Sequence, residues 1–565
     1  MNRLIGFVLA VVVVLVLAIG AISAVVIVRG GGGGGEEEQR AQPTKAATAE
    51  GRGEQRGGST GELRLPGSDP ITLDPALAGD AASATYIVEI FGGLVTIDPK
   101  LNIVPDIARE LPTRENGGIV NNPDGTVTYT FHLRDDVVFH NTSRLVTAGD
   151  FKYSMERALS PRTASTVAEA YLGDIVGARD MARGRADEVR GIEVVDDFTL
   201  KLTIDAPKPY FLAKLTYPTA FVVDREQVEA NPRNWSRKPN GTGPYKMREW
   251  RLGERITLEA NERYHLGKPS LETVTFLLAG GSVLTMYENN EIDVAGVGIT
   301  DIDRVQDPTS DLNAEYVTGD DLSISYIGFN TQVEPFNDPK VRQAFAHAID
   351  REKIAKVVLK DMLPVAQGVM MSGLPGHNPE SKALSFDPEL ARQLLKESKY
   401  GGPDRLPTVT ITEVGGGANV GFDTQAMVEM WKENLGVEVE IEQTEAATFF
   451  EDLDSGRLQM FVTGWIMDYP DPEDVLDVHF YSQSRLNNTR YSNPALDALL
   501  EQARTEQDVN RRMSLYQQAE QIVIEDAVWV PLYNGRDHAL VKPYVKGFEF
   551  PPMVIPHLRY VTIER

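Results

Sequence analysis

The sequence predicts an α/β protein built from more than one domain. Its 565 residues exceed what one hydrophobic core usually serves, so length alone indicates about two to four domains. In the C-terminal part, strand-like and helix-like segments alternate, which is typical of parallel strands covered by helices. The alternating segments are, in order, 409–412, 425–434, 437–442, 448–454 and 460–465.

The composition excludes several kinds of site and partner. There are 56 Lys and Arg residues against 82 Asp and Glu residues, which gives a formal net charge of −26. A nucleic-acid partner is therefore not expected, because phosphates need a basic face. Cysteine is absent, which excludes disulfides, thiolate metal sites, a cysteine nucleophile and a lipid on an N-terminal cysteine.

The N-terminal segment differs from the rest of the chain. Residues 4–28 carry no charge, and about 20 apolar residues suffice to cross a bilayer. We interpret residues 1–29 as a transmembrane anchor or uncleaved signal, with Arg3 on the cytoplasmic side and the bulk exported. A cleavable signal peptide is the alternative, since Ala21-Ile22-Ser23 offers small residues for cleavage. Residues 30–61, which begin with six glycines, read as a flexible linker.

Strong local patterns mark the folded part. Residues 126–133 alternate between apolar and polar side chains, as a half-buried strand does. Thr147 and Asp150 have the spacing of a capping box that starts a helix. Asp338 precedes a segment, 339–349, whose apolar residues fall at helical spacing, so we expect an N-capped helix there.

One stretch, 461–474 (FVTGWIMDYPDPED), stands out as a candidate site. It begins as an apolar strand in which Gly464 removes one side chain and Trp465 supplies a large ring. Glycine within a strand often marks the close approach of a ligand or another backbone. Asp471, followed by proline and two acidic residues, predicts a helix start, so Asp468 lies in the loop before that helix. The stretch indicates a site for a positively charged, peptide-like ligand; an ordinary strand–turn–helix junction is the alternative.

The sequence gives little sign of catalysis. Phosphate-binding loops, zinc-protease motifs, nucleophile elbows and calcium loops are missing from it. His132 and His140 flank one hairpin, but histidines at turns and strand edges are the simpler interpretation. We therefore expect a binding protein and not an enzyme, with no metal and no cofactor.

Six segments occur in the order found in one known family, and the similarity covers nearly everything after Glu62. They are LDPALAGDAASATYIVEIFGGLV, FHLRDDVVFHNT with TAGDFKYSMERA, NGTGPY, YIGFNT with DPKVRQAFAHAID, GWIMDYPDP, and a C-terminal segment beginning YSNPALDALLEQ. Together they resemble the extracytoplasmic solute-binding proteins of family 5. This family includes dipeptide-, oligopeptide- and nickel-binding proteins of ABC importers.

The resemblance implies a bilobed α/β fold of the periplasmic-binding-protein type, with two lobes joined by a hinge and an additional inserted domain. Lobe I is expected to comprise residues 62–92, 218–322 and 528–565, the inserted domain residues 93–217, and lobe II residues 323–527. Two strands that cross between the lobes are expected to form the hinge, and ligand is expected to be enclosed when the lobes close.

The resemblance also implies roles for particular residues. In the peptide-binding members, an aspartate at the position of Asp468 pairs with the α-ammonium of the ligand. Gly464, Trp465 and Ile466 are expected to supply backbone contacts to the peptide, as an added strand does. The lack of a histidine cluster near this motif argues against nickel. The residue for the far end of the ligand is open, with Arg485 and Arg490 as candidates in a nearby loop.

The expected function is capture of dipeptides or oligopeptides in the interlobe cleft and delivery to the permease subunits of an ABC transporter. The N-terminal helix is expected to hold the protein, as a monomer, on the extracytoplasmic face of the bacterial cytoplasmic membrane. A sugar or another cationic solute is the alternative ligand. A membrane-tethered ligand sensor or folding helper is the alternative role, and a peptide hydrolase is a third.

Overall fold

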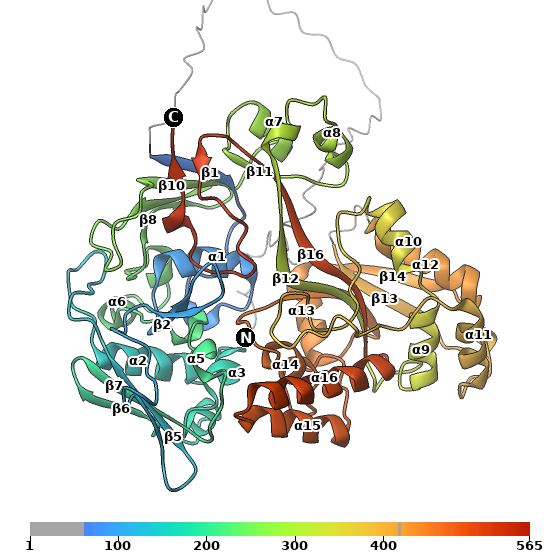
Figure 1. Ribbon diagram of the computed structural model, residues 1–565, viewed down its shortest axis with the longest axis horizontal. Helices are drawn as coiled ribbons and strands as arrows, with labels where there is room; N and C mark the ends of the chain where they lie inside the picture. The colour runs from blue at the N-terminus through green and yellow to red at the C-terminus, as the bar shows by residue number, and fades with distance from the viewer. Residues whose placement is uncertain (1–60, 416–419) are drawn as a thin grey trace, which may run out of the picture.

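The computed structural model describes residues 61–415 and 420–565, and its elements form two groups that lie side by side (Figure 1). Two long strands, β12 (Tyr316–Phe329) and β16 (Trp529–Val541), run through the middle between them. The expected membrane anchor, 1–29, and nearly all of the expected linker, 30–61, lie outside the described residues. Within the part described, none of the helices has the length and apolar character needed to cross a membrane.

The first group contains a four-stranded sheet with the strand order β1-β10-β9-β8. Every second residue of β1 and β9 is buried, and these side chains contact α1, where the ring of Tyr86 lies 4.9 Å from that of Phe276 on β10. The elements around this sheet are β1 (Glu62–Pro66), η1 (Pro75–Leu77), α1 (Ala81–Ile90), η2 (Pro218–Ala220), α6 (Arg225–Ala230), η3 (Trp235–Arg237), β8 (Tyr245–Arg251), β9 (Arg255–Ala260), β10 (Thr273–Leu277), α7 (Val283–Glu288), α8 (Ile302–Gln306), η4 (Asn313–Glu315), β17 (Val545–Lys546), η7 (Leu558–Tyr560) and β18 (Thr562–Ile563).

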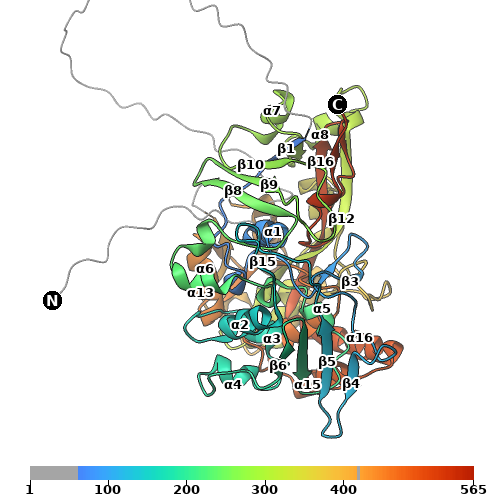
Figure 2. The same cartoon turned by 90° about the vertical axis from the view of Figure 1, so that its left-hand side faces the viewer.

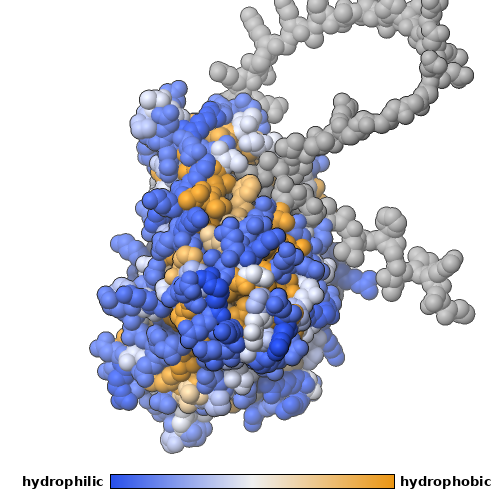
Figure 3. Space-filling view, turned by 90° about the vertical axis from the view of Figure 1, so that its right-hand side faces the viewer, coloured by the Kyte–Doolittle hydropathy of each residue, from blue (hydrophilic) through white to orange (hydrophobic). Residues whose placement is uncertain are grey.

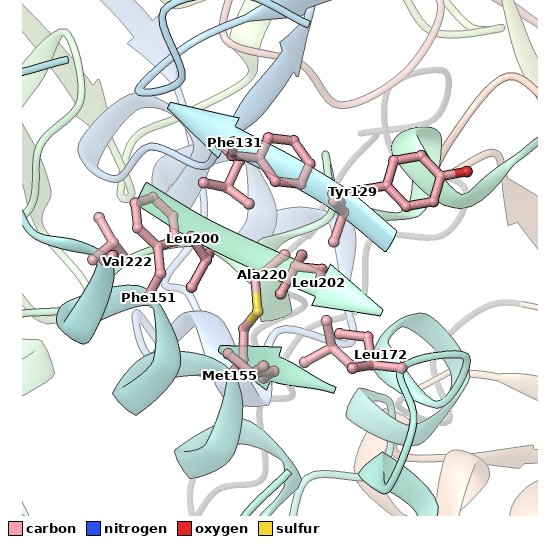
Figure 4. Packing of buried hydrophobic residues seen from close by; sticks show 14 of the residues in the cluster. Tyr129, Phe131, Phe151, Met155, Leu172, Leu200, Leu202, Ala220 and Val222 are labelled. Atoms are coloured by element: carbon pink, nitrogen blue, oxygen red, sulfur yellow. The ribbon is translucent and has the colours of Figure 1, made fainter. Parts of the chain in front are cut away.

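A second four-stranded sheet, with the order β4-β5-β7-β6, lies at the opposite end of the same group (Figure 2). The predicted strand 126–133 is β5, and the capping box of Thr147 and Asp150 starts α2 as predicted. Apolar side chains of β5, β7 and α2 point toward one another and form the core (Figure 4). The elements of this part are β2 (Val95–Ile97), β3 (Ile103–Pro105), β4 (Ile119–Asn121), β5 (Val127–His132), α2 (Ala148–Leu159), α3 (Ala168–Leu172), α4 (Ala178–Ala182), β6 (Ile192–Asp196), β7 (Thr199–Ile204) and α5 (Phe211–Lys214).

The largest sheet is mixed, with the order β11-β16-β12-β15-β13-β14. Its remaining strands are β11 (Val294–Gly296), β13 (Val409–Val414), β14 (Val439–Thr444) and β15 (Met460–Ile466). The β13–β14 and β13–β15 pairs are parallel, as the β/α alternation predicted. The β15–β12, β12–β16 and β16–β11 pairs are antiparallel, so the predicted parallel layer accounts for only three of the six strands.

Helices cover both faces of this sheet. Met460 and Val462 of β15 belong to a core around Phe345 and Trp431, and Phe461 belongs to a second core on the other face. The helices are α9 (Pro339–His347), α10 (Arg351–Lys353), η5 (Ile354–Val358), α11 (Pro388–Glu397), η6 (Pro403–Arg405), α12 (Phe422–Leu435), α13 (Ala446–Ser455), α14 (Glu473–Phe480), α15 (Pro494–Thr505) and α16 (Val509–Glu525). The outer face of this group is mostly hydrophilic, with scattered apolar patches (Figure 3). The limits predicted for the lobes and the inserted domain stay predictions.

The β12–β16 ladder is interrupted where the chain passes between the two groups. A bulge separates the pairs Asp320↔Arg536 and Ile324↔Asn534. Opposite the bulge, a Cβ on Gly535 would lie 1.9 Å from Oδ1 of Asp321, so a side chain at this position would clash with β12. Bulges disrupt a ladder locally and let a strand bend, so the ribbon can bend at this point.

A buried carboxyl joins α1 to the C-terminal segment and makes stability depend on pH. Glu89 is 1% exposed, and its Oε1 accepts the N–H groups of His557 and Leu558 at 2.9 Å each. Burial raises the pKa of Glu89 to about 7. Because the unfolded chain releases this proton at lower pH, the contribution of Glu89 to the free energy of unfolding falls by about 3 kcal/mol between about pH 4 and pH 8.

We therefore expect Glu89→Gln to match the wild type near pH 5 and to exceed its free energy of unfolding at pH 8. Glutamine keeps an oxygen acceptor for the two N–H groups and has no charge to bury. Urea unfolding at both pH values is the measurement, with the exposed Glu193→Gln as the control. A loss of stability at pH 8 would contradict the role given to this carboxyl.

Candidate functional site

The predicted strand–loop–helix stretch folds as expected, and Asp468 lies in the loop between β15 and α14. The carboxylate of Asp471 accepts the N–H of Glu473 at 3.0 Å, but the helix begins one residue later than predicted, with Pro472 at its N-cap. Nη1 of Arg512 on α16 donates to the same carboxylate at 2.7 Å, which holds the loop against the helices behind it. The loop that carries Asp468 is therefore held at its C-terminal end by the contacts of Asp471.

One edge of β15 is open for most of its length. The strand pairs with β12 from Met460 to Ile466, but with β13 only at Met460 and Phe461. From Val462 onward, none of the described residues forms a second strand beside it. A strand edge with unpaired N–H and C=O groups is a template for another extended chain.

The register decides which backbone groups face this open edge. Met467 donates its N–H to the C=O of Leu322 on the β12 side at 2.9 Å. Hydrogen-bonded pairs alternate along an antiparallel ladder, so the backbone of Trp465 is also bonded to β12. The N–H and C=O groups of Gly464 and Ile466 therefore point toward the open edge.

The opposite wall of the site comes from the first group of elements. The hydroxyl of Tyr171, on α3, donates a hydrogen bond to Oδ2 of Asp468. The ring of Tyr171 stacks on that of Tyr217, with centroids 3.7 Å apart and planes 6° apart. Tyr469 packs edge-on against Tyr171 from the other side. The contact brings together residues that the sequence analysis did not connect, because Tyr171 and Asp468 are 297 positions apart.

Three of the five acidic side chains between Asp468 and Asp477 have a cationic partner. Glu473 is 2.9 Å from Nζ of Lys214, and Asp477 accepts from Nε of Arg504 at 2.8 Å. Asp471 is paired with Arg512, as described above. Asp468 and Asp474, in contrast, have no cationic partner among the residues described. The site therefore carries negative charge that the surrounding protein does not compensate.

Burial raises the pKa of Asp468, because the charged form loses water that the protein does not replace with a cation. Any positive charge that enters the site beside this carboxylate reverses that penalty. The site is therefore suited to a cationic group that has N–H donors for both oxygens.

The rings of Trp465 and His479 pack against each other next to Asp474. Their rings lie 4.3 Å apart in an edge-on arrangement, and the indole N–H donates to Oδ2 of Asp474 at 3.3 Å. Burial lowers the pKa of His479 to about 3, so this imidazole is neutral at physiological pH. In the part of the chain described, no three His, Asp or Glu side chains are grouped so that they could hold a metal ion.

The two arginines named as candidates for the far end of the ligand have different surroundings. Arg490 donates to the C=O of Asp454 and so supports the end of α13. Arg485 lies 3.5 Å from Glu169 of α3, beside a cavity of about 320 Å³ that Arg183 also lines. Arg485 thus lies at the seam between the two groups of elements.

A family model described as bacterial extracellular solute-binding proteins, family 5, matches residues 102–487, which is more than half of the chain. The chain belongs to this family. Among the curated family 5 relatives, the oligopeptide-binding protein OppA of Bacillus subtilis is 28% identical, over 89% of this chain and 93% of that protein.

Two solved structures are similar to this chain over most of its length. The murein tripeptide-binding protein MppA of Escherichia coli matches with a TM-score of 0.77 and 29% identity, over 90% of this chain and 99% of that one. OppA of Haemophilus influenzae, in complex with the peptide RPPGFSPFR, also gives a TM-score of 0.77, with 25% identity over 90% and 100% of the two chains.

Family 5 membership confirms three of the predictions: the resemblance itself, the mixed α/β fold and a solute-binding role that is not enzymatic. It also confirms an extracytoplasmic location for the folded part. The roles of Asp468, Gly464, Trp465 and Ile466 are not tested by it.

Proposed function

We propose that this family 5 protein binds peptides by their free amino end, between its two lobes, and delivers them to an ABC permease. The observation that carries the proposal is the uncompensated carboxylate of Asp468 beside the open edge of β15. The names of the relatives support it, because MppA and the OppA proteins are described as peptide-binding.

The amino end of a peptide fits the carboxylate. An α-ammonium has three N–H donors, and a hydrogen bond between charged groups contributes about 1.5–3 kcal/mol, more than a neutral one. The hydrogen bond from the hydroxyl of Tyr171 supports this, because it reaches Asp468 from the other group of elements. A peptide that brings its ammonium to Asp468 would therefore also be touched by both lobes.

The peptide backbone fits the open edge. Gly464 and Ile466 offer N–H and C=O groups at the spacing of an added strand, and Trp465 contributes its ring and not its backbone. Backbone contacts of this kind do not depend on the ligand's side chains. Bending of the β12–β16 ribbon at its bulge would open and close the cleft.

A free peptide and its N-acetylated form should differ strongly in affinity. Acetylation removes the positive charge and leaves Asp468 without a cation, so we expect affinity to fall at least about 100-fold. Titration calorimetry with one pentapeptide in both forms is the measurement. Equal affinities would contradict the proposal, and native mass spectrometry of the purified protein would then show whether a sugar or another solute is carried instead.

The proposed transport role requires the protein to be held at the membrane. We propose that residues 1–29 tether a monomer to the cytoplasmic membrane, so that released peptide is close to the permease. Peptide uptake that is lost on deletion of the protein supports this role. Unchanged uptake, with peptide binding intact, would favour the alternative of a ligand sensor.

A further inference from the structure

Building on the peptide-binding function proposed above, we propose that Asp474 is a second carboxyl of the ammonium site, and that it carries a proton. In this role Asp474 orients Asp468 and Trp465, and Asp468 remains the single negative charge that faces the ligand. Asp474 is thus a positioning residue that sets the charge of the site.

The geometry distinguishes the two oxygens of Asp474. Its side chain has 0% exposure in the first turn of α14. Oδ2 accepts the N–H of Asp468 at 2.8 Å and the indole N–H of Trp465 at 3.3 Å. Oδ1 is buried and has no hydrogen-bond partner among the described residues.

A neutral carboxyl fits this asymmetry better than an ionised carboxylate, because a buried hydroxyl without a partner costs less than a buried charge without one. In a carboxylate both oxygens share the charge, so Oδ1 would hold buried charge without a donor or a cation, which is costly. In a carboxyl, the carbonyl oxygen takes the place of Oδ2 and accepts both N–H groups, and the hydroxyl takes the place of Oδ1. The N-terminal turn of α14 favours an anion, but this effect is smaller than that of an unpaired buried charge.

Among the residues that the structure describes, no unpaired cation faces Asp474. Apart from Asp468, the ionised groups that face it are already paired with one another, and the remaining titratable groups are neutral at pH 7. The paired groups are Asp471 with Arg512, Glu473 with Lys214, and Asp477 with Arg504; the neutral groups are Tyr171, Tyr217, Tyr469 and His479. Burial and the neighbouring Asp468 raise the pKa of Asp474 well above its ordinary value.

A proton on Asp474 leaves the site with one negative charge, which equals the single positive charge of the ligand's α-ammonium. With Asp474 neutral, one carboxylate faces one α-ammonium, and the buried pair has no net charge. The hydrogen bond from the backbone of Asp468 to Asp474 also fixes the loop, so the carboxylate is held in place before the peptide arrives.

The test compares the same isosteric change at two positions. Asp474→Asn keeps a carbonyl acceptor for both N–H groups and replaces the hydroxyl with an amide NH2, so peptide affinity should stay within about threefold of wild type. Asp468→Asn should lower it at least about 100-fold. Asp474→Leu removes the acceptor, and we expect a loss of about tenfold or more. A tenfold loss in Asp474→Asn would show that the ionised form matters and would overturn the proposal.

Infrared difference spectroscopy of the peptide-free, full-length protein supplies a second readout. At neutral pH, the wild type minus Asp474→Asn spectrum should contain the C=O band of a protonated carboxylic acid, and the band should persist in Asp468→Asn. Lack of the band would overturn the proposal whatever the affinities are. If the wild type binds no peptide, the proposed function fails, and the band still decides whether Asp474 carries a proton.

Discussion

Asp468→Asn is expected to lower peptide affinity at least about 100-fold and to leave the fold intact. The amide keeps the shape of the side chain and an acceptor for the hydroxyl of Tyr171, but it removes the only charge available to the ligand's ammonium. Losing one partner of a desolvated charge pair costs about 2–5 kcal/mol. Calorimetric titration of wild type and variant with one peptide measures the effect.

The control for this prediction is Asp187→Asn, the same change at an exposed position in the loop before β6. It should leave both affinity and thermal unfolding unchanged. Unchanged affinity in Asp468→Asn, with peptide binding to the wild type established, would mean that the ammonium is bound elsewhere. A large drop in melting temperature would instead show that the carboxylate has a structural role.

The second large effect is expected at Lys214, whose ammonium connects the two groups of elements. Its Nζ lies 3.3 Å from Asp174 on its own side and 2.9 Å from Glu473 on the other, and its side chain is only 5% exposed. In Lys214→Met, Glu473 loses its cation in the closed form. Removal of one partner from a buried ion pair costs about 3–5 kcal/mol. We expect the closed form to become less populated and peptide affinity to fall at least about 30-fold.

A double variant separates loss of closure from general damage. Lys214→Met combined with Glu473→Gln leaves no unpaired carboxylate at the contact, so it should regain part of the lost affinity. Small-angle X-ray scattering should show that the single variant is more extended than wild type at the same peptide concentration. If the single and double variants are equally weak and equally compact, the pair does not control closure.

Those parts of the fold could be predicted that depend on patterns within one short segment of the sequence. The β/α alternation predicts that β13, β14 and β15 form one parallel layer, in which β14 and β15 lie on either side of β13. The antiparallel pairing of β12 with β15 and β16 was not foreseen from the residues. It joins segments far apart in the chain, and a strand's composition does not specify its partner.

The same distinction applies to the site. Gly464, Trp465 and Asp468 could be named because they lie in one short strand–loop–helix stretch with recognisable turn chemistry. Tyr171 and Lys214 could not be named, because they reach the site only through the packing of α3 and α5 against the other group. The sequence alone could not show which residues of β15 turn their backbone N–H and C=O groups toward the open edge. That Gly464 and Ile466 do so follows from the register of β15 with β12.

The β12–β16 ribbon also constrains the order in which the protein can fold. β11 pairs with the far end of β16, so the six-stranded sheet stays incomplete at this end until residue Val541 is available. A chain synthesised from its amino end therefore holds β11 and β12 without their main partner until nearly all of it has emerged. Such distant pairing slows folding and leaves strand edges exposed in the meantime. The six-stranded sheet therefore depends on the C-terminal strand β16.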